Sequence, residues 1–518
     1  MLLQSFLEET APRVPQKTAL VCGSRRLSYA ELENQANQMA HALRSLGLRP
    51  GDRVVIHLGN CVETVVAIFA VLKAGGVFVM VNPTTKTKKL AYLLDHCRAA
   101  AIVLPTRRLA ALRPMFGRRE QLRAVITTGR GLAETDPAKP PAWTMDDLLA
   151  RHAEDTAPPA IPTIDMDLAA LLYTSGSTGS PKGVMLTHLN MVSAARSIIS
   201  YLENRPDDVI LNVLPLSFGY GLYQVLMAAQ FGGTVVLEPS LAYPHAVLSK
   251  LTEERATGLP LVPTMAALLL QMDLGKYDLS SLRYVTSAGA ALPVEHLEGL
   301  RRAIPQAKIY VMYGQTECAR VTYLPPSAID QRPTSVGRGM PNQEVAVVDP
   351  VGRRVASGET GELVVRGSHV MKGYWEMPEA TQATLRPGPF ADDRPALWTG
   401  DLFRIDEEGY LYFVARKDDI IKSRGEKVSP KEVEDALYCH PAVAEAVVLG
   451  IPDEVLGEAI KAFVVLRPGC EVSEQELLRH AAEQLEDFMV PQYIEFRDTL
   501  PKSENGKILK QELQEVLA

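Results

Sequence analysis

The most distinctive stretch of the chain reads Tyr173-Thr174-Ser175-Gly176-Ser177-Thr178-Gly179-Ser180-Pro181-Lys182-Gly183. An apolar segment, residues 168–172, precedes it and predicts a strand, while residues 184–186 lead into a helical pattern that opens at residue 187. Glycines let the backbone adopt φ > 0 and turn its N–H groups inward as an anion-binding nest. Lys182 adds a positive charge, and five hydroxyls suit donation to phosphate oxygens: Thr174, Ser175, Ser177, Thr178 and Ser180. The stretch therefore predicts a loop that binds a nucleoside triphosphate.

Two other interpretations of this loop are considered. A flexible Gly/Ser linker rarely carries a Pro-Lys-Gly end and an apolar strand in front. A Walker loop requires a hydroxyl residue directly after its lysine to hold Mg²⁺, and here Gly183 follows Lys182. The sequence therefore fits poorly with the composition of a linker and with the spacing of a Walker loop.

The bulk properties limit the class of protein. A chain of 518 residues exceeds one ordinary core, so two to four domains or subdomains are expected. A net charge of −7 argues against a nucleic-acid groove. Six widely spaced cysteines form no C-x-x-C pair, and no signal peptide or apolar run of spanning length is visible. A cytoplasmic protein is the resulting prediction.

Alternation of predicted strands and helices indicates an α/β fold. Residues 53–58, 77–81 and 101–104 are predicted strands, with helices at 63–73 and near 88–95 between them, as in a parallel sheet. Residues 130–165 are rich in Pro, Ala, Asp and Thr and are predicted to be a loose connection. From residue 419 onward the pattern is α+β and indicates a separate, smaller domain.

The phosphate loop resembles that of the adenylate-forming enzymes, the superfamily of acyl-CoA synthetases, adenylation domains and luciferases. Further motifs in family order extend this resemblance over residues 27–507. It implies a large N-terminal domain, residues 1–416, with two parallel α/β subdomains and a small distorted β-barrel. A small mobile α+β C-terminal domain, residues 419–518, is implied to follow a hinge at 417–418.

Tyr313-Gly314-Gln315-Thr316-Glu317 follows a predicted strand, residues 308–313, at the end where open α/β sheets bind ligands. The Tyr313 ring suits stacking on adenine, the Thr316 hydroxyl suits a phosphate, and the Glu317 carboxylate suits Mg²⁺. A helix N-terminus capped by Thr316 is the structural alternative. The resemblance implies that Thr316, Glu317 and the C-terminal Lys507 are catalytic, with Glu317 as the metal ligand.

Other nucleotide-binding residues are implied by position. The small residues of a predicted turn after a strand, Gly289, Ala290 and Ala291, would edge the adenine. Asp401 is predicted to lie on a Gly turn, where its two oxygens would hold the ribose hydroxyls, helped by Arg416. The family usually has Gly before that arginine, and this chain has Ala415, which puts the local backbone conformation in doubt.

Residues 211–221 are predicted to form a strand that ends in a Gly-punctuated turn. By resemblance, this segment lines the acyl pocket. Gly219 stands where amino-acid adenylation domains have an Asp for the substrate ammonium, so an α-amino acid is disfavoured. Similarity to benzoate-type ligases favours a benzoate- or anthranilate-like aryl acid, with a medium- or long-chain fatty acid as the alternative. The predicted acyl-pocket residues are Phe218, Gly219, Tyr220, Ala288 and Gly314.

The implied activity is that of an ATP-dependent acid–CoA ligase. A carboxylate would attack the α-phosphorus of ATP with Mg²⁺ present, pyrophosphate would leave, and the acyl group would pass to a thiol. The sequence continues for eleven residues past Lys507 without a carrier domain, so free CoA or a separate acyl carrier protein is the expected acceptor. Asp418, Lys422 and Gly425 are the predicted hinge and CoA-side residues, and a homodimer is a further expectation.

Overall fold

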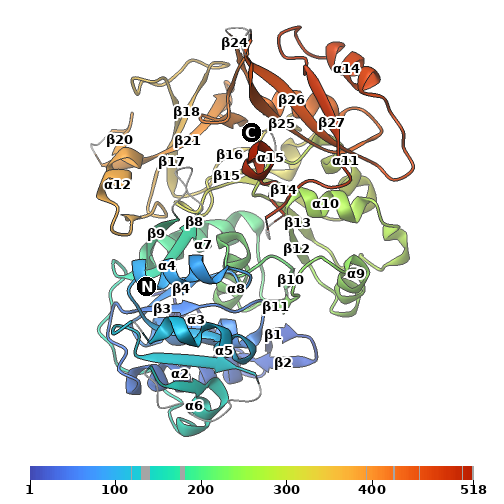
Figure 1. The fold of residues 1–518 in the computed structure, drawn as a ribbon. Coiled ribbons are helices and arrows are strands. Elements are labelled where there is room, and N and C mark those ends of the chain that lie inside the picture. The colour runs from blue at the N-terminus through green and yellow to red at the C-terminus, as the bar shows by residue number, and fades with distance from the viewer. Residues whose placement is uncertain are drawn as a thin grey trace.

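The computed structural model describes residues 1–117, 119–129, 140–174, 181–391, 394–423, 426–453, 456–503 and 506–515. Two large sheets form the body of this part of the chain (Figure 1), and they are mixed sheets with parallel centres. In spatial order the first contains β16 (Arg338–Gly339), β15 (Thr322–Leu324), β14 (Lys308–Tyr313), β13 (Tyr284–Ser287), β12 (Gly258–Leu261), β10 (Val209–Asn212), β11 (Thr234–Leu237), β1 (Thr18–Cys22) and β2 (Arg25–Ser28). The second contains β19 (Gly373–Tyr374), β9 (Lys182–Thr187), β8 (Leu168–Thr174), β4 (Val77–Met80), β3 (Arg53–Ile56), β5 (Ala99–Pro105), β6 (Ala124–Thr128) and β7 (Ala142–Thr144).

The chain contributes strands alternately to the two sheets. The N-terminal strand β1 pairs in parallel with β11, more than 200 residues later, and so belongs to the first sheet. Six of the described helices contribute side chains to the largest buried apolar cluster, which also includes residues of both sheets. Among them are α2 (Tyr29–Ser45), α3 (Val62–Lys73), α7 (His188–Leu202) and α8 (Gly219–Phe231). One shared core therefore joins the sheets.

Local sequence explains where several helices begin. Ser28 and Glu31 form a reciprocal capping box at α2, and Thr187 with Asn190 does the same at α7, directly after β9. The remaining α-helices are α1 (Ser5–Thr10), α4 (Thr87–His96), α5 (Thr106–Phe116), α6 (Met145–Arg151), α9 (Pro244–Glu253), α10 (Pro263–Leu270), α11 (Val294–Ala303), α12 (Pro378–Thr384), α13 (Pro430–Tyr438), α14 (Glu474–Ala482) and α15 (Lys510–Glu515). Within the described ranges, no helix has both the length and the apolar character needed to cross a bilayer.

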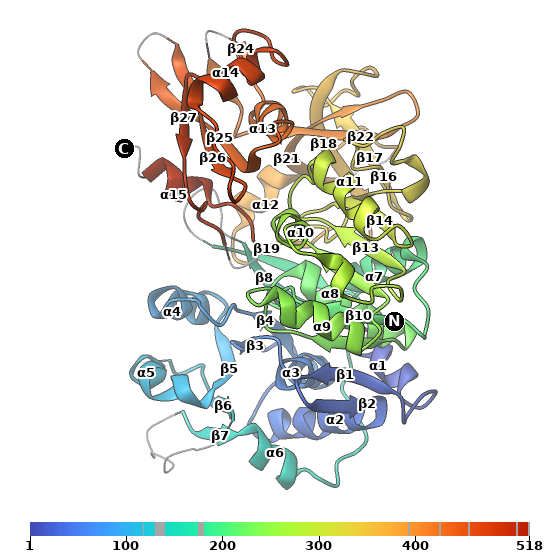
Figure 2. The ribbon, with the colours of Figure 1, turned by 90° about the vertical axis from the view of Figure 1, so that its right-hand side faces the viewer.

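Two smaller sheets complete the fold (Figures 1 and 2). An antiparallel half-barrel contains β17 (Gln343–Val348), β18 (Thr360–Gly367), β21 (Pro395–Ile405), β20 (Leu385–Pro387) and β22 (Leu411–Arg416). The C-terminal sheet contains β24 (Glu426–Val428), β23 (Ile421–Ser423), β26 (Gly457–Leu466), β25 (Val443–Asp453) and β27 (Tyr493–Phe496), and α13 and α14 pack on it with a separate apolar cluster. The predicted fold class, including the half-barrel and the small C-terminal α+β unit, is confirmed.

Three local expectations are wrong. Residues 219–221 open α8 instead of forming a turn. Glycine is needed at 221 because a side chain there would meet the Pro215 carbonyl oxygen at 2.5 Å. The connection at 130–165 contains β7 and α6 within its described part, residues 140–165. Thr316 caps no helix, since residues 316–319 form a turn that leads to β15.

Gly337 generates a prediction about stability, because it joins the first sheet to the half-barrel. Its φ is +88°, its carbonyl accepts a hydrogen bond from the Leu411 amide at 2.8 Å, and a Cβ there would overlap the Tyr323 carbonyl. Gly337→Ala is expected to lower the free energy of unfolding by about 3 kcal/mol or more, because backbone strain and steric overlap add. Urea denaturation measures this.

Gly358→Ala is the matched control. Gly358 has φ +86° but open space around a Cβ, so its substitution should cost only about 1 kcal/mol of conformational strain. Equal losses for the two variants would contradict the close approach at Gly337.

Candidate active site

Several predicted site residues follow neighbouring strands of the first sheet. Strands β10, β12, β13 and β14 are parallel and adjacent, so their carboxyl ends meet at one edge. Phe218 lies beyond β10, the 288–291 turn follows β13, and residues 314–317 follow β14. Gly289 has φ +93°, which confirms that a tight turn follows β13. The fold thus gathers three of the predicted motifs at one edge.

Asp401 is held at the end of β14 by residues of the same motif. Its Oδ2 accepts hydrogen bonds from the Tyr313 hydroxyl at 2.6 Å and from Gln315 Nε2 at 2.7 Å. Burial and the neighbouring Asp401 carboxylate raise the pKa of Tyr313, so the phenol stays protonated and donates. Asp401 is only 4 % exposed, and its Oδ1 has no hydrogen-bond donor among the described residues.

Asp401 lies on a bulge within a strand, not on the Gly turn that the surrounding sequence predicted. Residues 399–401 interrupt the β18–β21 register, Gly400 adopts φ +71°, and the flanking pairs on both sides continue β21. Arg416, at the end of the paired strand β22, places Nε 3.3 Å from Asp401 Oδ1. Ala415 pairs with Leu402 in ordinary strand conformation, so the replacement of glycine there causes no strain.

Glu317 and Lys182 come together through one tyrosine. The Tyr374 hydroxyl donates to Glu317 Oε1 at 2.8 Å, and Lys182 Nζ lies 5.3 Å from the centroid of the Tyr374 ring. Tyr374 belongs to β19, which pairs with β9 directly after the phosphate loop. The far end of that loop therefore meets the Tyr313–Glu317 motif. Four predicted phosphate-binding residues lie outside the described residues: Ser175, Gly176, Ser177 and Thr178.

Lys507 reaches the same edge from the C-terminal sheet region. The Thr264 hydroxyl, just after β12, donates to the Gly506 carbonyl at 3.0 Å. The Lys507 side chain is exposed, yet partial burial of its amine and the nearby Arg416 charge lower its pKa, while Asp401 and Asp419 oppose the shift. Lys507 is thus within electrostatic range of the Asp401–Arg416 pair, although the two regions are about a hundred residues apart in the sequence.

The predicted acyl-pocket residues share a polar neighbour. The Tyr220 hydroxyl and Thr286 Oγ1 are 2.6 Å apart, which ties α8 to β13 next to Ala288. A Cβ on Gly219 would meet no atom within 4 Å, whereas one on Gly314 would collide with the Ala319 carbonyl. The buried Arg320 guanidinium lies 4.7 Å from the Tyr220 ring centroid. Sequence reasoning missed Arg320, which follows the recognised motif by three residues.

The predicted hinge and CoA-side residues are not gathered with the others. Asp418 is exposed in the turn after β22, and Lys422 is exposed on β23, where its backbone N–H donates to Glu458 Oε2 at 2.6 Å. Gly425 lies outside the described residues. Within the described residues, no hydrogen bond or ion pair links Asp418 or Lys422 to Lys507 or Asp401.

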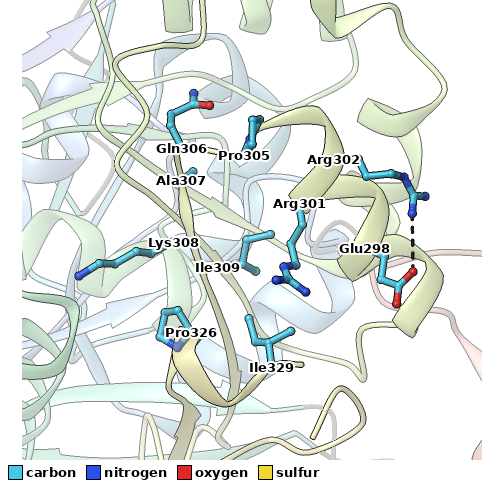
Figure 3. A pocket seen from close by; sticks show the side chains of 10 residues that line it. All are labelled: Glu298, Arg301, Arg302, Pro305, Gln306, Ala307, Lys308, Ile309, Pro326 and Ile329. Atoms are coloured by element: carbon cyan, nitrogen blue, oxygen red, sulfur yellow. Dashed lines mark ion pairs between the residues drawn. The ribbon is translucent and has the colours of Figure 1, made fainter. Parts of the chain in front are cut away.

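A cavity of about 600 Å³ lies elsewhere (Figure 3). It is lined by residues of α11, of the amino end of β14 around Lys308 and by Pro326 and Ile329. This is the end of β14 opposite Tyr313, so the cavity is separate from the candidate active site.

Comparison with known proteins agrees with this geometry. The family model described as AMP-binding enzyme matches residues 7–375, and the model described as AMP-binding enzyme C-terminal domain matches residues 432–507. The chain belongs to the AMP-binding enzyme family. It is 35 % identical to a long-chain-fatty-acid–CoA ligase of Bacillus subtilis (strain 168), covering 99 % of this chain and 94 % of that protein.

A feruloyl-CoA synthase of an Amycolatopsis species is also 35 % identical, covering 99 % of this chain and 98 % of the relative. Among solved structures, an anthranilate CoA ligase in complex with anthranoyl-AMP superposes with a TM-score of 0.90 at 29 % identity, covering 100 % of this chain and 97 % of that one. This AMP-binding enzyme is accordingly an AMP-forming acid–CoA ligase, with ATP and CoA as its co-substrates.

Two further side chains of the AMP-binding enzyme act on predicted site residues but were not predicted. Tyr374 lies in the stretch Met371-Lys372-Gly373-Tyr374-Trp375, which also resembles the family, and that resemblance was the available signal. Gln315 lies inside the Tyr313–Glu317 motif, and its amide bridges Asp401 and the Thr399 carbonyl at 2.8 Å. Only the tertiary structure reveals that both side chains orient carboxylates.

Asp401→Asn should weaken binding of AMP to this enzyme at least about tenfold. The amide removes the charge that pairs with Arg416 and one acceptor that would serve a ribose hydroxyl. Isothermal titration measures the dissociation constant. Asp406→Asn is the control, because Asp406 also accepts from a tyrosine, Tyr412, at 3.0 Å but lies five residues farther along the chain, away from Tyr313. Equal weakening in both variants would contradict a local role for Asp401.

Proposed function

We propose that the enzyme activates a carboxylic acid of aryl type as an acyl-adenylate and then transfers the acyl group to CoA. The observation that carries this proposal is the contact of Gly506 with Thr264, which brings Lys507 within electrostatic range of Asp401 and Arg416, at the edge where Lys182 and Glu317 both lie beside Tyr374. Three remote segments of the chain thus surround one place, as a reaction on an ATP-derived group requires.

The adenosine half of the site would be bound by the β14 end and the half-barrel. Tyr313 and the 289–291 turn would flank the adenine, and Asp401 Oδ1, which lacks a donor, would accept a ribose hydroxyl beside Arg416. Tyr313 is already oriented by its bond to Asp401 and by edge-to-face contact with Phe403, whose ring centroid is 4.8 Å away. The nucleotide would therefore meet side chains that need little rearrangement.

The phosphate half would combine cations with one carboxylate. Lys182 and the hydroxyl of Thr316 would bind phosphate oxygens, together with the loop between β8 and β9. Glu317 fits a Mg²⁺ ligand, because Tyr374 holds one carboxylate oxygen while hard oxygen donors are what this cation prefers. The described residues contain no cluster of three His, Cys, Asp or Glu side chains, so one carboxylate with phosphates and water would complete such a site.

The chemistry has two steps. The substrate carboxylate oxygen forms a bond to the α-phosphorus of ATP, the bond from that phosphorus to the bridging oxygen breaks, and pyrophosphate leaves. Lys507 would stabilise the charge that develops on the phosphoryl oxygens. In the second step the CoA thiolate sulfur attacks the acyl carbon, and AMP leaves with the bonding electron pair.

The C-terminal unit would change position between the steps. We place the hinge at residues 417–418, between the half-barrel and the C-terminal sheet, with Asp418 exposed in the connecting turn. The described arrangement, with Gly506 bound to Thr264, is the one suited to adenylate formation. A rotation that breaks this bond would remove Lys507 and bring the face containing Lys422 toward the acyl-adenylate.

The proposal that the substrate is an aryl acid is based on the pocket residues Phe218, Gly219 and Tyr220 and on the names of the relatives. Their names include an anthranilate ligase and a feruloyl ligase, which act on aryl acids, and also a fatty-acid ligase. Open space at Gly219 beside aromatic side chains suits a flat ring. The alternatives of a medium- or long-chain fatty acid, and of a carrier protein as acceptor, are tested in the same experiment.

Pyrophosphate release should be fastest with aryl acids in a panel of benzoates, cinnamates and fatty acids of graded length. Each acid is tested with ATP alone, with CoA and with a phosphopantetheinyl carrier protein. A preference of at least about tenfold in kcat/KM for the aryl acids supports the proposal, because a complementary pocket distinguishes shapes by 1–3 kcal/mol. Faster turnover of fatty acids would overturn the aryl assignment, and acyl transfer only to the carrier would overturn CoA as acceptor.

Lys507→Ala should slow adenylate formation at least about 100-fold, because a charge that stabilises the transition state is lost. Conversion of a supplied acyl-adenylate and CoA to the thioester should be unaffected. Single-turnover assays of the two half-reactions measure both rates. Lys502→Ala is the control. Lys502 Nζ pairs with Glu445 Oε1 at a distance of 2.7 Å, and this ion pair lies away from the site. Equal loss of both half-reactions would show that Lys507 has a different role.

A further inference from the structure

Arg320 is a buried cation without an acidic partner. The residue is 5 % exposed, no described carboxylate lies within ion-pair distance of it, and its Nε has no hydrogen-bond acceptor among the described residues. A buried guanidinium without a counter-ion is costly, and proteins normally pair such groups. Arg320 therefore differs from Arg283, a comparable inner arginine, whose guanidinium donates to Asp208 Oδ2 at 2.8 Å.

Three tyrosines surround this cation. Its guanidinium carbon is 4.7 Å from the Tyr220 ring centroid, and its charge is felt by the phenols of Tyr201 and Tyr223. Burial raises the pKa of Tyr220 to about 12, so this phenol is neutral at physiological pH and supplies no compensating charge. Aromatic faces stabilise a cation in part, but they do not replace an anion.

Arg320 is also next to the residues predicted to contact the acid. Its charge lies over the Tyr220 ring, and its backbone Cα would be 2.8 Å from a Cβ placed on Gly314. The Tyr220 hydroxyl is already paired with Thr286 Oγ1, so the Tyr220 side chain is fixed beside the guanidinium. The unpaired cation thus lies beside Tyr220 and Gly314, two of the residues predicted to line the acyl pocket.

We propose that Arg320 binds a second anionic group on the acid substrate, so that the enzyme prefers dicarboxylic acids over monocarboxylic acids of the same skeleton. This inference rests on the proposed acid–CoA ligase function and specifies its substrate class. One carboxylate reacts with ATP, and the other forms a charge-assisted hydrogen bond with the guanidinium. A monocarboxylic acid leaves the buried charge unpaired, which disfavours its binding.

Matched acid pairs test the preference in the unmodified enzyme. Pyrophosphate release is measured with hexanoate and adipate, octanoate and suberate, and benzoate and its isophthalate and terephthalate counterparts. At least one diacid should exceed its monoacid about 30-fold in kcat/KM, the effect expected for one buried charge pair. Efficient use of the monoacids with no such preference would overturn the inference and leave the ligase function intact. Failure of every acid would overturn the ligase function, and the inference with it.

Variants of Arg320 separate recognition from support of the fold. Arg320→Met should abolish the preference, lowering kcat/KM for the diacid about 30-fold or more while leaving that for the monoacid unchanged or raised. Arg320→Lys keeps the charge and should retain a preference for the diacid, with KM for ATP unchanged. Thermal unfolding of each variant accompanies the kinetics.

Arg338→Met is the matched control, because Arg338 is also stacked on a tyrosine, Tyr410, but is exposed and has an acidic partner, Glu408, at 3.6 Å. It should leave the ratio of diacid to monoacid unchanged. Arg320 would have a purely structural role if Arg320→Met lowered kcat/KM equally for the diacid and the monoacid. The same conclusion would follow if Arg338→Met abolished the preference for the diacid. If Arg320→Met fails to fold, the ratio measured with the unmodified enzyme and with Arg320→Lys decides.

Discussion

The buried Asp401 carboxylate is the interaction on which the arrangement of this enzyme depends. It accepts from Tyr313 and Gln315 at the end of β14, and it pairs with Arg416 at the end of β22. One acid thereby ties the first large sheet to the half-barrel and to the strand that leads into the C-terminal unit. A buried carboxylate is stable only when its oxygens are paired, so this joint admits few alternative geometries. The residues assigned to adenosine are consequently fixed before any ligand binds.

The connection to Lys507 has a different character. It includes a hydrogen bond between Thr264 and the Gly506 carbonyl, and Cys439 Sγ lies 3.4 Å from Glu295. Elsewhere the C-terminal unit meets the body through the Ser429 hydroxyl, which donates to the Val414 carbonyl at 2.6 Å, and through edge-to-face contact of His296 with Tyr438. Such exposed or neutral bonds each contribute about 1 kcal/mol, far less than a packed core. A rigid nucleotide end and a weakly attached lysine are what an enzyme requires if the same edge must serve two successive reactions.

Sequence predicted most of this fold, for reasons that particular elements illustrate. The strand expected at residues 308–313 is β14, because an apolar run is bounded by a charged residue and a Gly-containing motif. The helix at Gly219 was missed, since its two glycines normally indicate a turn and only the neighbouring Pro215 carbonyl explains the glycine at 221. For the site, motifs identified Glu317, Asp401 and Lys507. Arg320 and Tyr374 act through tertiary contacts, which no local pattern contains.

The charge distribution explains why these cations are concentrated at one edge. The chain contains 61 acidic and 54 basic residues, so its overall field repels ATP, CoA and a carboxylate substrate alike. Cations beside the ligand overcome this repulsion because interactions at short range in a partly buried site are screened far less than those across the surface. Lys182, Arg416 and Lys507 would serve the nucleotide, which leaves Arg320 as a charge that the nucleotide does not use. Its retention in a tyrosine-lined interior, at the desolvation cost of an unpaired guanidinium, is explained most simply by a substrate that brings its own second anion.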